Sequence, residues 1–430
     1  MQFFHKLGSV VELNWRRRNY DEREFPAIAA EALAEANAID GPSPWDMICS
    51  LHANLDLPTQ LSDKFSDLAI TLYHAPRFHI SAYFWLDGTT SVHQHAFSGA
   101  FQVLLGSSIH SHYQFTQTEI VNPHMAIGEL DLKDIQLLNK GSISQIHCGS
   151  EFIHSLFHLD RPSVTLTIRT HSSVRALPQY KYLSPCLAID PFFDDRVTTR
   201  RIQSIQLLLR MMHPEVDSFI GQLVKSLDFQ STYSILSVVF SFFTDPELSR
   251  VFQVANGNER FRALIDVARE KHGALVDLLP PVFEEVQRQE KIIAQRKLVH
   301  TVEQRFFLAL LLNVPGKARI LDLVSKRYPT RDPIDSVCAW VLQLSAIKTP
   351  ALRDSNILGI DGFDETYLVV FRGLLENLSI AVIEQSLKEK GSLQRANEQW
   401  GGVEKMRHAL ENSNLLKTMF KPDDNHRAVR

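Results

Sequence analysis

The stretch HQHAFSGAFQVLLG, residues 93–106, places His93 and His95 one residue apart and follows them with a glycine-punctuated apolar run. An apolar run of this length bounded by turn residues predicts a β-strand. Side chains at positions i and i+2 of an extended segment point to the same side, so the two imidazoles face one space. Because histidine is a common metal ligand, the stretch predicts a strand with part of a metal site at its entrance.

Short alternating segments extend on both sides of this stretch, from Tyr73 to about Arg169. They read RFHISAYFWL, GAFQVLLG, GELDL, SISQI and SVTLTIR, with Gly, Asn, Pro and Ser between them. Their spacing leaves no room for the helix that must connect parallel strands. The pattern therefore predicts an antiparallel β sandwich or small barrel.

After IDPFFDD, Ile189 to Asp195, the apolar period becomes that of helices. DPEL and DPID predict that Asp245 and Asp332 are N-caps, each followed by a proline at the first helical position. At least seven helical segments are expected in this half. Near the N-terminus, FPAIAAEALAEANA predicts one clear helix, and a second is possible around PWDMICSLHANL.

The predicted fold class is therefore α+β with several domains, an antiparallel β-barrel followed by an all-helical domain. We expect an N-terminal helical segment over residues 1–65 that packs on the barrel, and the barrel itself over 66–190. An all-helical domain is expected over 191–420, and a flexible tail over 421–430.

Composition excludes several classes of function. The formal net charge is -4 and basic residues form no long run, so we expect neither nucleic-acid binding nor attachment to an anionic membrane. Four cysteines without a CxxC pair, and no long apolar segment, predict a cytoplasmic protein. Phosphate-binding loops, GxSxG elbows and HExxH helices are missing from the sequence.

Histidines gather in the β half, where 11 of the 18 lie between His74 and His171. Their pattern resembles the two motifs of the cupin superfamily, over roughly residues 70 to 172. The first motif is matched by Gly88, His93, His95 and Gly106, and the second by Gly141, Gly149 and His154. The resemblance implies a jelly-roll-like barrel with a metal inside it.

The sequence departs from the superfamily pattern in three places. His147 replaces the usual proline of the second motif, and His158 stands where asparagine is usual. The glutamate of the first motif is missing, because Gly99 or Ala100 occupies its position. What remains is a three-histidine site, which resembles the cysteine dioxygenase type of thiol dioxygenase.

The predicted metal ligands are His93, His95 and His154, with His147 and His158 as competitors for the third place. HSH at 110–112 is interpreted as polar residues at a strand end. The resemblance implies Fe(II), although imidazole ligands suit other divalent transition metals equally well. Three neutral ligands leave the site one charge unit more positive than a site with a carboxylate, which favours an anionic substrate.

Strand parity supplies three candidate catalytic residues. Arg169 shares a face with Thr165 and Thr167, and we expect it to point inward and hold a substrate carboxylate. Tyr83 is expected to orient a substrate or supply a proton. Gln102 is expected to line the same cavity as Ala100.

Two functions are consistent with these features. The first is a metal-dependent oxygenase that acts on a small thiol or another small anion. The second is a non-catalytic sensor or regulatory protein whose helical domain binds a protein partner. A homodimer through the helical domain is a further expectation, and no organic cofactor is expected.

Overall fold

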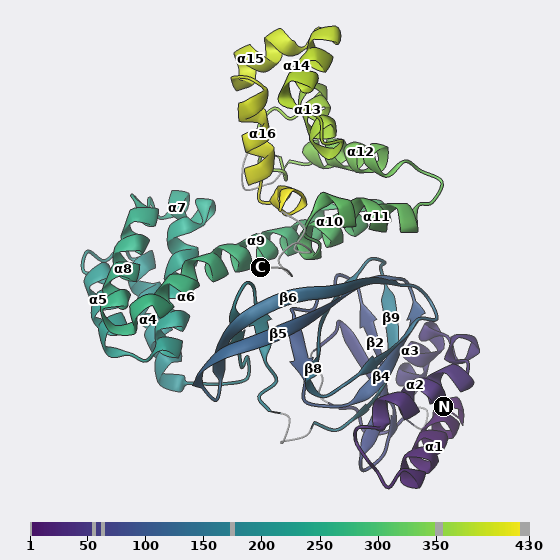
Figure 1. Cartoon of the computed structure of the whole chain (residues 1–430). Helices are drawn as coiled ribbons and strands as arrows, with labels where there is room; N and C mark the ends of the chain where they lie inside the picture. Colours follow the sequence, from purple (N-terminus) through teal and green to yellow (C-terminus); the bar gives the residue numbers. More distant parts are fainter. Residues whose placement is uncertain (1, 54–56, 62–64, 173–176, 349–355, 422–430) are drawn as a thin grey trace.

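The computed structural model describes residues 2–53, 57–61, 65–172, 177–348 and 356–421. Helices near the N-terminus lie against one side of a β region, and the helices of the C-terminal half lie to its left and above it in Figure 1. The predicted fold class, an antiparallel β-barrel followed by helices, is confirmed. The predicted tail, apart from its first residue, lies outside the described residues.

Two antiparallel sheets form the β region. One is five-stranded, with the order β1-β2-β9-β4-β7, and the other closes into a barrel with the order β10-β11-β6-β5-β8-β3. Every pairing between these strands is antiparallel. The strands are β1 (Leu68–His74), β2 (Phe78–Trp85), β3 (His93–His95), β4 (Gly99–Leu105), β5 (Ser108–Asn122), β6 (Met125–Leu138), β7 (Ile143–Ile146), β8 (Gly149–His158), β9 (Ser163–Thr170), β10 (Lys181–Leu183) and β11 (Leu187–Ile189).

The long hairpin of β5 and β6 differs most from the sequence prediction. Only the short segment GELDL was expected there, whereas the two strands have 15 and 14 residues. The far half of β5 is largely exposed, so it lacks the alternation that marks a half-buried strand. The end of the hairpin instead packs on helices through Met125 and Ile127.

Three helices cover the outer face of the five-stranded sheet: α1 (Gln2–Arg17), α2 (Phe25–Glu35) and α3 (Pro44–His52). Alternate residues of the sheet, such as Ile80, Ala100 and Leu166, lie with Phe4, Trp15 and Phe25 of the helices in one apolar core. Helix α1 was not predicted from the sequence. Because this face of β2, β4 and β9 is committed to the helices, the alternate side chains point into the barrel.

The C-terminal helices form two groups, joined by α9 as it passes over β5 and β6 (Figure 1). The first contains α4 (Arg196–Arg210), α5 (Val216–Ser226), α6 (Phe229–Thr244), α7 (Pro246–Val251), α8 (Gly257–His272), the 3-10 helix η3 (Gly273–Leu278) and α9 (Leu279–Gln295). The second follows η4 (Arg296–Leu298) and contains α10 (Val302–Asn313), α11 (Lys317–Arg327), α12 (Pro333–Ser345), α13 (Glu365–Leu375), α14 (Ile380–Glu389), α15 (Leu393–Trp400) and α16 (Val403–Asn412).

Local sequence explains where two of these helices begin. The side chain of Asp332 accepts a hydrogen bond from the Asp335 backbone nitrogen at the start of α12, and that of Asp245 accepts one from Leu248 at the start of α7. Both N-caps were predicted. No helix in the described part of the chain has the length and apolar character that crossing a membrane requires.

Both helical groups share apolar cores with the barrel. Leu183 and Leu187 lie in one core with α4, α6 and α9, while Phe157 and Leu159 lie in another with α10 and α12. Burial of apolar surface across these contacts favours a fixed position of the helices on the barrel. The helical half is therefore packed on the outer wall of the β region, on the far side of β5 and β8 from the barrel interior.

Candidate metal centre

Three buried histidines converge inside the barrel. His93 lies directly opposite His154 of β8, and a bulge between His93 and His95 separates the two neighbours along β3. Among the described residues, His93, His95 and His154 form a group whose ligand atoms all lie within 4.8 Å of one another. The structure thus brings together the three side chains that the sequence singled out as a metal-binding set.

The hydrogen bonds of these rings leave Nε2 atoms directed at one another. His93 Nδ1 lies 2.7 Å from the carbonyl oxygen of Ser91, so it carries a proton and donates it, which leaves Nε2 with a free lone pair. That Nε2 is buried and has no hydrogen-bond partner among the described residues. The Nε2 atoms of His95 and His154 lie 2.8 Å apart. A cation between the three atoms would satisfy the unpartnered lone pair.

A fourth histidine holds His154 from behind. His110 Nε2 lies 2.8 Å from His154 Nδ1, and both side chains are almost completely buried. Metal-binding imidazoles usually donate their other ring nitrogen to an acceptor that sets the tautomer and orientation. The prediction that HSH at 110–112 lies at a strand end fits the start of β5 at Ser108, but it gave no role to His110, whose ring is buried against His154.

Burial keeps these imidazoles neutral. It lowers the pKa of His93, and burial together with the neighbouring histidines holds the pKa of His95 and of His154 well below the usual range. A metal binds the neutral form, so the protein presents its ligands ready for coordination near neutral pH.

The same burial predicts a stability that depends on pH. It lowers the pKa of His158 and of His79 from 6.5 to about 3. The unfolded chain takes up these protons near pH 6.5 while the folded chain does not, so stability is full above pH 6.5 and falls below it, by up to about 1.4 kcal/mol per pH unit for each group. We expect the urea midpoint of the metal-free protein to be clearly lower at pH 5.5 than at pH 7.5. Equal midpoints would contradict this reading of the buried histidines.

Apolar rings surround the histidine group. Phe97 lies 4.4 Å from His95 and Phe152 lies 4.5 Å from His154, measured between ring centroids. These rings belong to a core of inward-facing side chains from both sheets. Such surroundings exclude water and strengthen electrostatic interactions at the site.

The barrel has no room for an acidic ligand at the position where the cupin pattern has glutamate. A Cβ atom on Gly99 would lie 2.1 Å from the carbonyl oxygen of Ile168, and the side chain of Ala100 lies in the core with the N-terminal helices. Any side chain larger than hydrogen at Gly99 would force β4 away from β9. Close strand packing therefore accounts for the lack of an acidic side chain at this position beside the three histidines.

The two competing histidines lie outside the convergent group. His158 stacks on Trp85 with ring centroids 4.5 Å apart, and its Nδ1 lies 2.9 Å from the hydroxyl of Ser108. His147 is half-buried in the connection between β7 and β8. Neither belongs to the set of three with ligand atoms in coordination range.

Arg169 and Tyr83 face the barrel interior, as the strand parity predicts. Arg169 Nε donates to His79 Nε2 at 3.0 Å, and its guanidinium lies 4.2 Å from the centre of the Phe97 ring. Its charge also contributes to the lowered pKa of His95. Tyr83 is buried beside Trp85. Their catalytic roles remain predictions.

Gln102 lies on the other face of β4. It shares that face with Ala100 and Leu104, which pack on the N-terminal helices, and its amide donates to the carbonyl of Gly141. Phe101, on the opposite face, has its ring 5.9 Å from that of His110. The parity shared with Ala100 thus directs Gln102 away from the histidines, and its catalytic role stays a prediction without support from this geometry.

A cavity of about 560 Å³ leads to His93. It is lined by Phe65, Ser66, Asp67, Trp85, Asp87, Gly88, Thr89, Thr90, Ser91, His93, Gln179, Lys181, Pro191 and Phe192. Lys181, which was not predicted as a site residue, lies directly opposite His93 on the neighbouring strand β10. No motif marks this lysine, because only the strand pairing brings it to the site.

Comparisons with known proteins show likeness over part of the chain. No family model matches the sequence, and no curated protein matches it. Hydroquinone 1,2-dioxygenase from Sphingomonas sp. TTNP3 is 10% identical over 25% of this chain and 68% of its own, with a TM-score of 0.20. A DMSP lyase from Ruegeria pomeroyi DSS-3 is 13% identical over 34% and 72%, with a TM-score of 0.21.

A cupin superfamily protein from Desulfitobacterium hafniense DCB-2 is 14% identical over 27% of this chain and 94% of its own, with a TM-score of 0.18. Likeness at this level gives no residue of this chain a role. The chemistry of the site therefore follows from its own side chains.

Proposed function

We propose that this protein is a metal-dependent oxygenase, with Fe(II) as its metal, that acts on a small anionic molecule. The observation that carries the proposal is the convergence of His93, His95 and His154. Burial lowers the pKa of all three rings and so favours their neutral form, and the buried Nε2 of His93 has no hydrogen-bond partner among the described residues. Burying a ring nitrogen without a hydrogen-bond partner costs free energy, and a cation bound between the three rings would remove that cost.

The protein residues and the metal have separate tasks in this proposal. The three histidines would hold one face of the ion, and the ion would supply open positions where dioxygen and substrate meet and exchange electrons. Phe97 and Phe152 exclude water from that place. The positive charge of Arg169 near His95 favours an anion over a neutral molecule.

The cavity at His93 supports an anion with a flat apolar part as the substrate class. Phe65 and Trp85 form one wall, with ring centroids 5.1 Å apart. Lys181 shares a face with His93 because the two residues are cross-strand neighbours. A molecule with its apolar part on the aromatic wall could direct a carboxylate or thiolate at Lys181 and at the metal.

The carboxylates of the cavity are already engaged by the protein. Asp67 accepts a hydrogen bond from the Leu86 backbone at 2.8 Å, and Asp87 accepts one from Arg161 at 2.7 Å. Lys181 has no ion-pair partner in the part of the chain that the structure describes. The cavity therefore keeps one cationic side chain for a ligand.

Oxygen consumption tests the function directly. The protein is loaded with Fe(II) without oxygen and mixed with air-saturated buffer and one of a panel of thiols and aromatic carboxylates, such as 3-mercaptopropionate and 4-hydroxybenzoate. We expect uptake with at least one member, and none in the H95A variant. Stoichiometric Fe(II) binding without uptake on any member would contradict the oxygenase and favour a binding or regulatory protein.

The charge of Lys181 provides a specificity test once a substrate is known. The K181M variant is expected to raise KM about 10-fold or more with a smaller change in kcat, because the ammonium is expected to bind the anionic group equally in the substrate and in the transition state. Lys140, in the turn after β6, supplies the control variant K140M. Equal KM values for K181M and the wild type would exclude Lys181 from substrate binding.

A further inference from the structure

A buried arginine of the helical half reaches into the wall of the substrate cavity. We propose that Arg296 is a positioning residue, which fixes the segment 86–92 and through it the ring of His93. The functional meaning of this inference rests on the proposed metal site, whereas the contacts themselves do not. If Arg296 has this role, the helical half helps to position a metal ligand, a function that no sequence motif of that half indicates.

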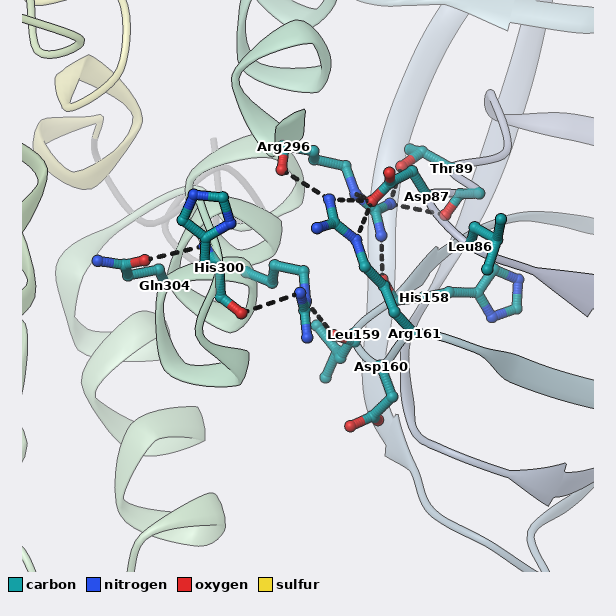
Figure 2. A network of polar contacts seen from close by, with 12 residues as sticks. Leu86, Asp87, Thr89, His158, Leu159, Asp160, Arg161, Arg296, His300 and Gln304 are labelled. Carbon is teal, nitrogen blue, oxygen red and sulfur yellow. Dashed lines mark hydrogen bonds and ion pairs between the residues drawn. The ribbon is translucent and has the colours of Figure 1, made fainter. Parts of the chain in front are cut away.

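Arg296 begins η4 and is 1% exposed. Its Nη1 donates to the Gly88 carbonyl at 2.7 Å and to the Thr89 hydroxyl, and its Nη2 donates to the His158 carbonyl (Figure 2). The guanidinium also lies 4.0 Å from the centre of the Phe157 ring. A buried charge with this many acceptors is held in one geometry, because a lost contact leaves it uncompensated.

The acceptors of Arg296 belong to the cavity wall. Gly88 and Thr89 line the cavity, and a side chain on Gly88 would collide with the Trp85 ring. Two residues further on, the Ser91 carbonyl lies 2.7 Å from His93 Nδ1. That carbonyl sets the tautomer and the direction of the His93 ring.

Between these two points the segment is tied to β8. The Thr90 backbone nitrogen donates to the Leu156 carbonyl at 2.8 Å, and the Thr90 hydroxyl accepts from the Leu156 nitrogen at 2.7 Å. Residues 88 to 93 therefore form a short chain of fixed contacts from the guanidinium of Arg296 to the imidazole of His93. If Gly88 and Thr89 move, Ser91 and its carbonyl are therefore expected to move with them, and so is the His93 ring that this carbonyl orients.

A reciprocal contact fixes the backbone of Arg296 itself. Arg161 donates through Nη2 to the Arg296 carbonyl at 2.9 Å and through Nε to Asp87 at 2.7 Å (Figure 2). Asp87 also lies 3.9 Å from Arg296 Nε. Arg161 of the barrel thus binds the backbone of the helical half, Arg296 of the helical half binds the backbone of the barrel, and Asp87 lies close to both arginines.

Arg305 offers a matched control in the same interface. It is 5% exposed, and it donates to the carbonyls of Leu159 and His300, which lie outside the segment 86–92. Loss of either arginine removes a buried charge from the contact between the barrel and the helices. The two variants R296M and R305M therefore separate a general loss of docking from a specific effect on the cavity wall.

Two measurements on the full-length protein test the inference. The first is hydrogen exchange of residues 86–93 without metal, and the second is the affinity and visible absorption spectrum of Co(II). In R296M we expect exchange to rise about 10-fold or more, Co(II) affinity to fall about 10- to 100-fold and the spectrum to change. R305M should leave the exchange and the spectrum as in the wild type, and R296K should restore part of the protection.

The outcomes are distinguishable from a failure of the proposed function. Equal loosening of residues 86–93 in R296M and R305M, or none in R296M, would overturn the positioning role. Loosening in R296M alone, in a protein that binds no Co(II) even as wild type, would refute the metal site and retain the positioning role. If R296M does not fold, T89V removes one acceptor of the guanidinium, and unchanged exchange in T89V and R296K would overturn the inference.

Discussion

Replacing His154 by alanine is expected to remove metal binding, with a fall in metal affinity of more than about 100-fold. Loss of a residue that only hydrogen-bonds to a metal ligand lowers the affinity about 10- to 100-fold, and loss of the ligand itself should lower it further. The reason is its central position. His154 Nε2 lies 2.8 Å from His95 Nε2, and the residue is directly opposite His93 in the strand pairing. Without His154 only two of the three proposed imidazole ligands remain, so the ion loses one of its protein ligands. Metal content per chain, measured by mass spectrometry after anaerobic loading with Fe(II) and gel filtration, checks this result.

The control for H154A is H124A. His124 is a partly exposed histidine that pairs with Asp190 at 2.8 Å, next to the end of the β5 and β6 hairpin. H124A should retain the metal content of the wild type. If H154A also retains it while its unfolding transition remains cooperative, His154 is not a ligand.

Replacing His110 by alanine is expected to weaken metal binding about 10- to 100-fold without abolishing it. His110 contributes no ligand in this account. Its Nε2 lies 2.8 Å from His154 Nδ1. With a metal bound it would accept the Nδ1 proton and so hold His154 in the tautomer that leaves Nε2 free. Titration of the metal-free protein with Co(II), followed by visible absorption, gives the affinity.

A conservative variant distinguishes hydrogen bonding from packing at this position. H110Q keeps an acceptor of similar reach, so we expect it to recover part of the lost affinity, whereas H110F fills the space and should not. Equal affinities for H110Q and H110F would mean that the hydrogen bond is irrelevant. Unchanged affinity in H110A would contradict the role of His110 altogether.

Local sequence was sufficient for strands that are buried in an alternating pattern. Phe78–Trp85 and Ser163–Thr170 were predicted as strands because one face packs on the N-terminal helices and the other lines the barrel. The hairpin of β5 and β6 was missed because half of it reaches past the barrel to the helices. Its burial is decided by a contact distant in the chain, which no local period encodes.

The candidate site divides in the same way. His93, His95 and His154 could be proposed from motif spacing, because the motifs mark positions on strands that meet in the fold. His110 could not, since nothing local distinguishes a buried strand position from a strand end. Lys181 and Arg296 reach the cavity only through strand pairing and through the contact between helices and barrel.

The measurement that tests the central claim most directly is anomalous diffraction at the metal edge, from crystals of the protein loaded with Fe(II) under anaerobic conditions. The account predicts one strong peak about 2 Å from an Nε2 atom of each of His93, His95 and His154. A peak at other residues, or no peak in crystals with demonstrated metal in the soaking solution, would contradict it.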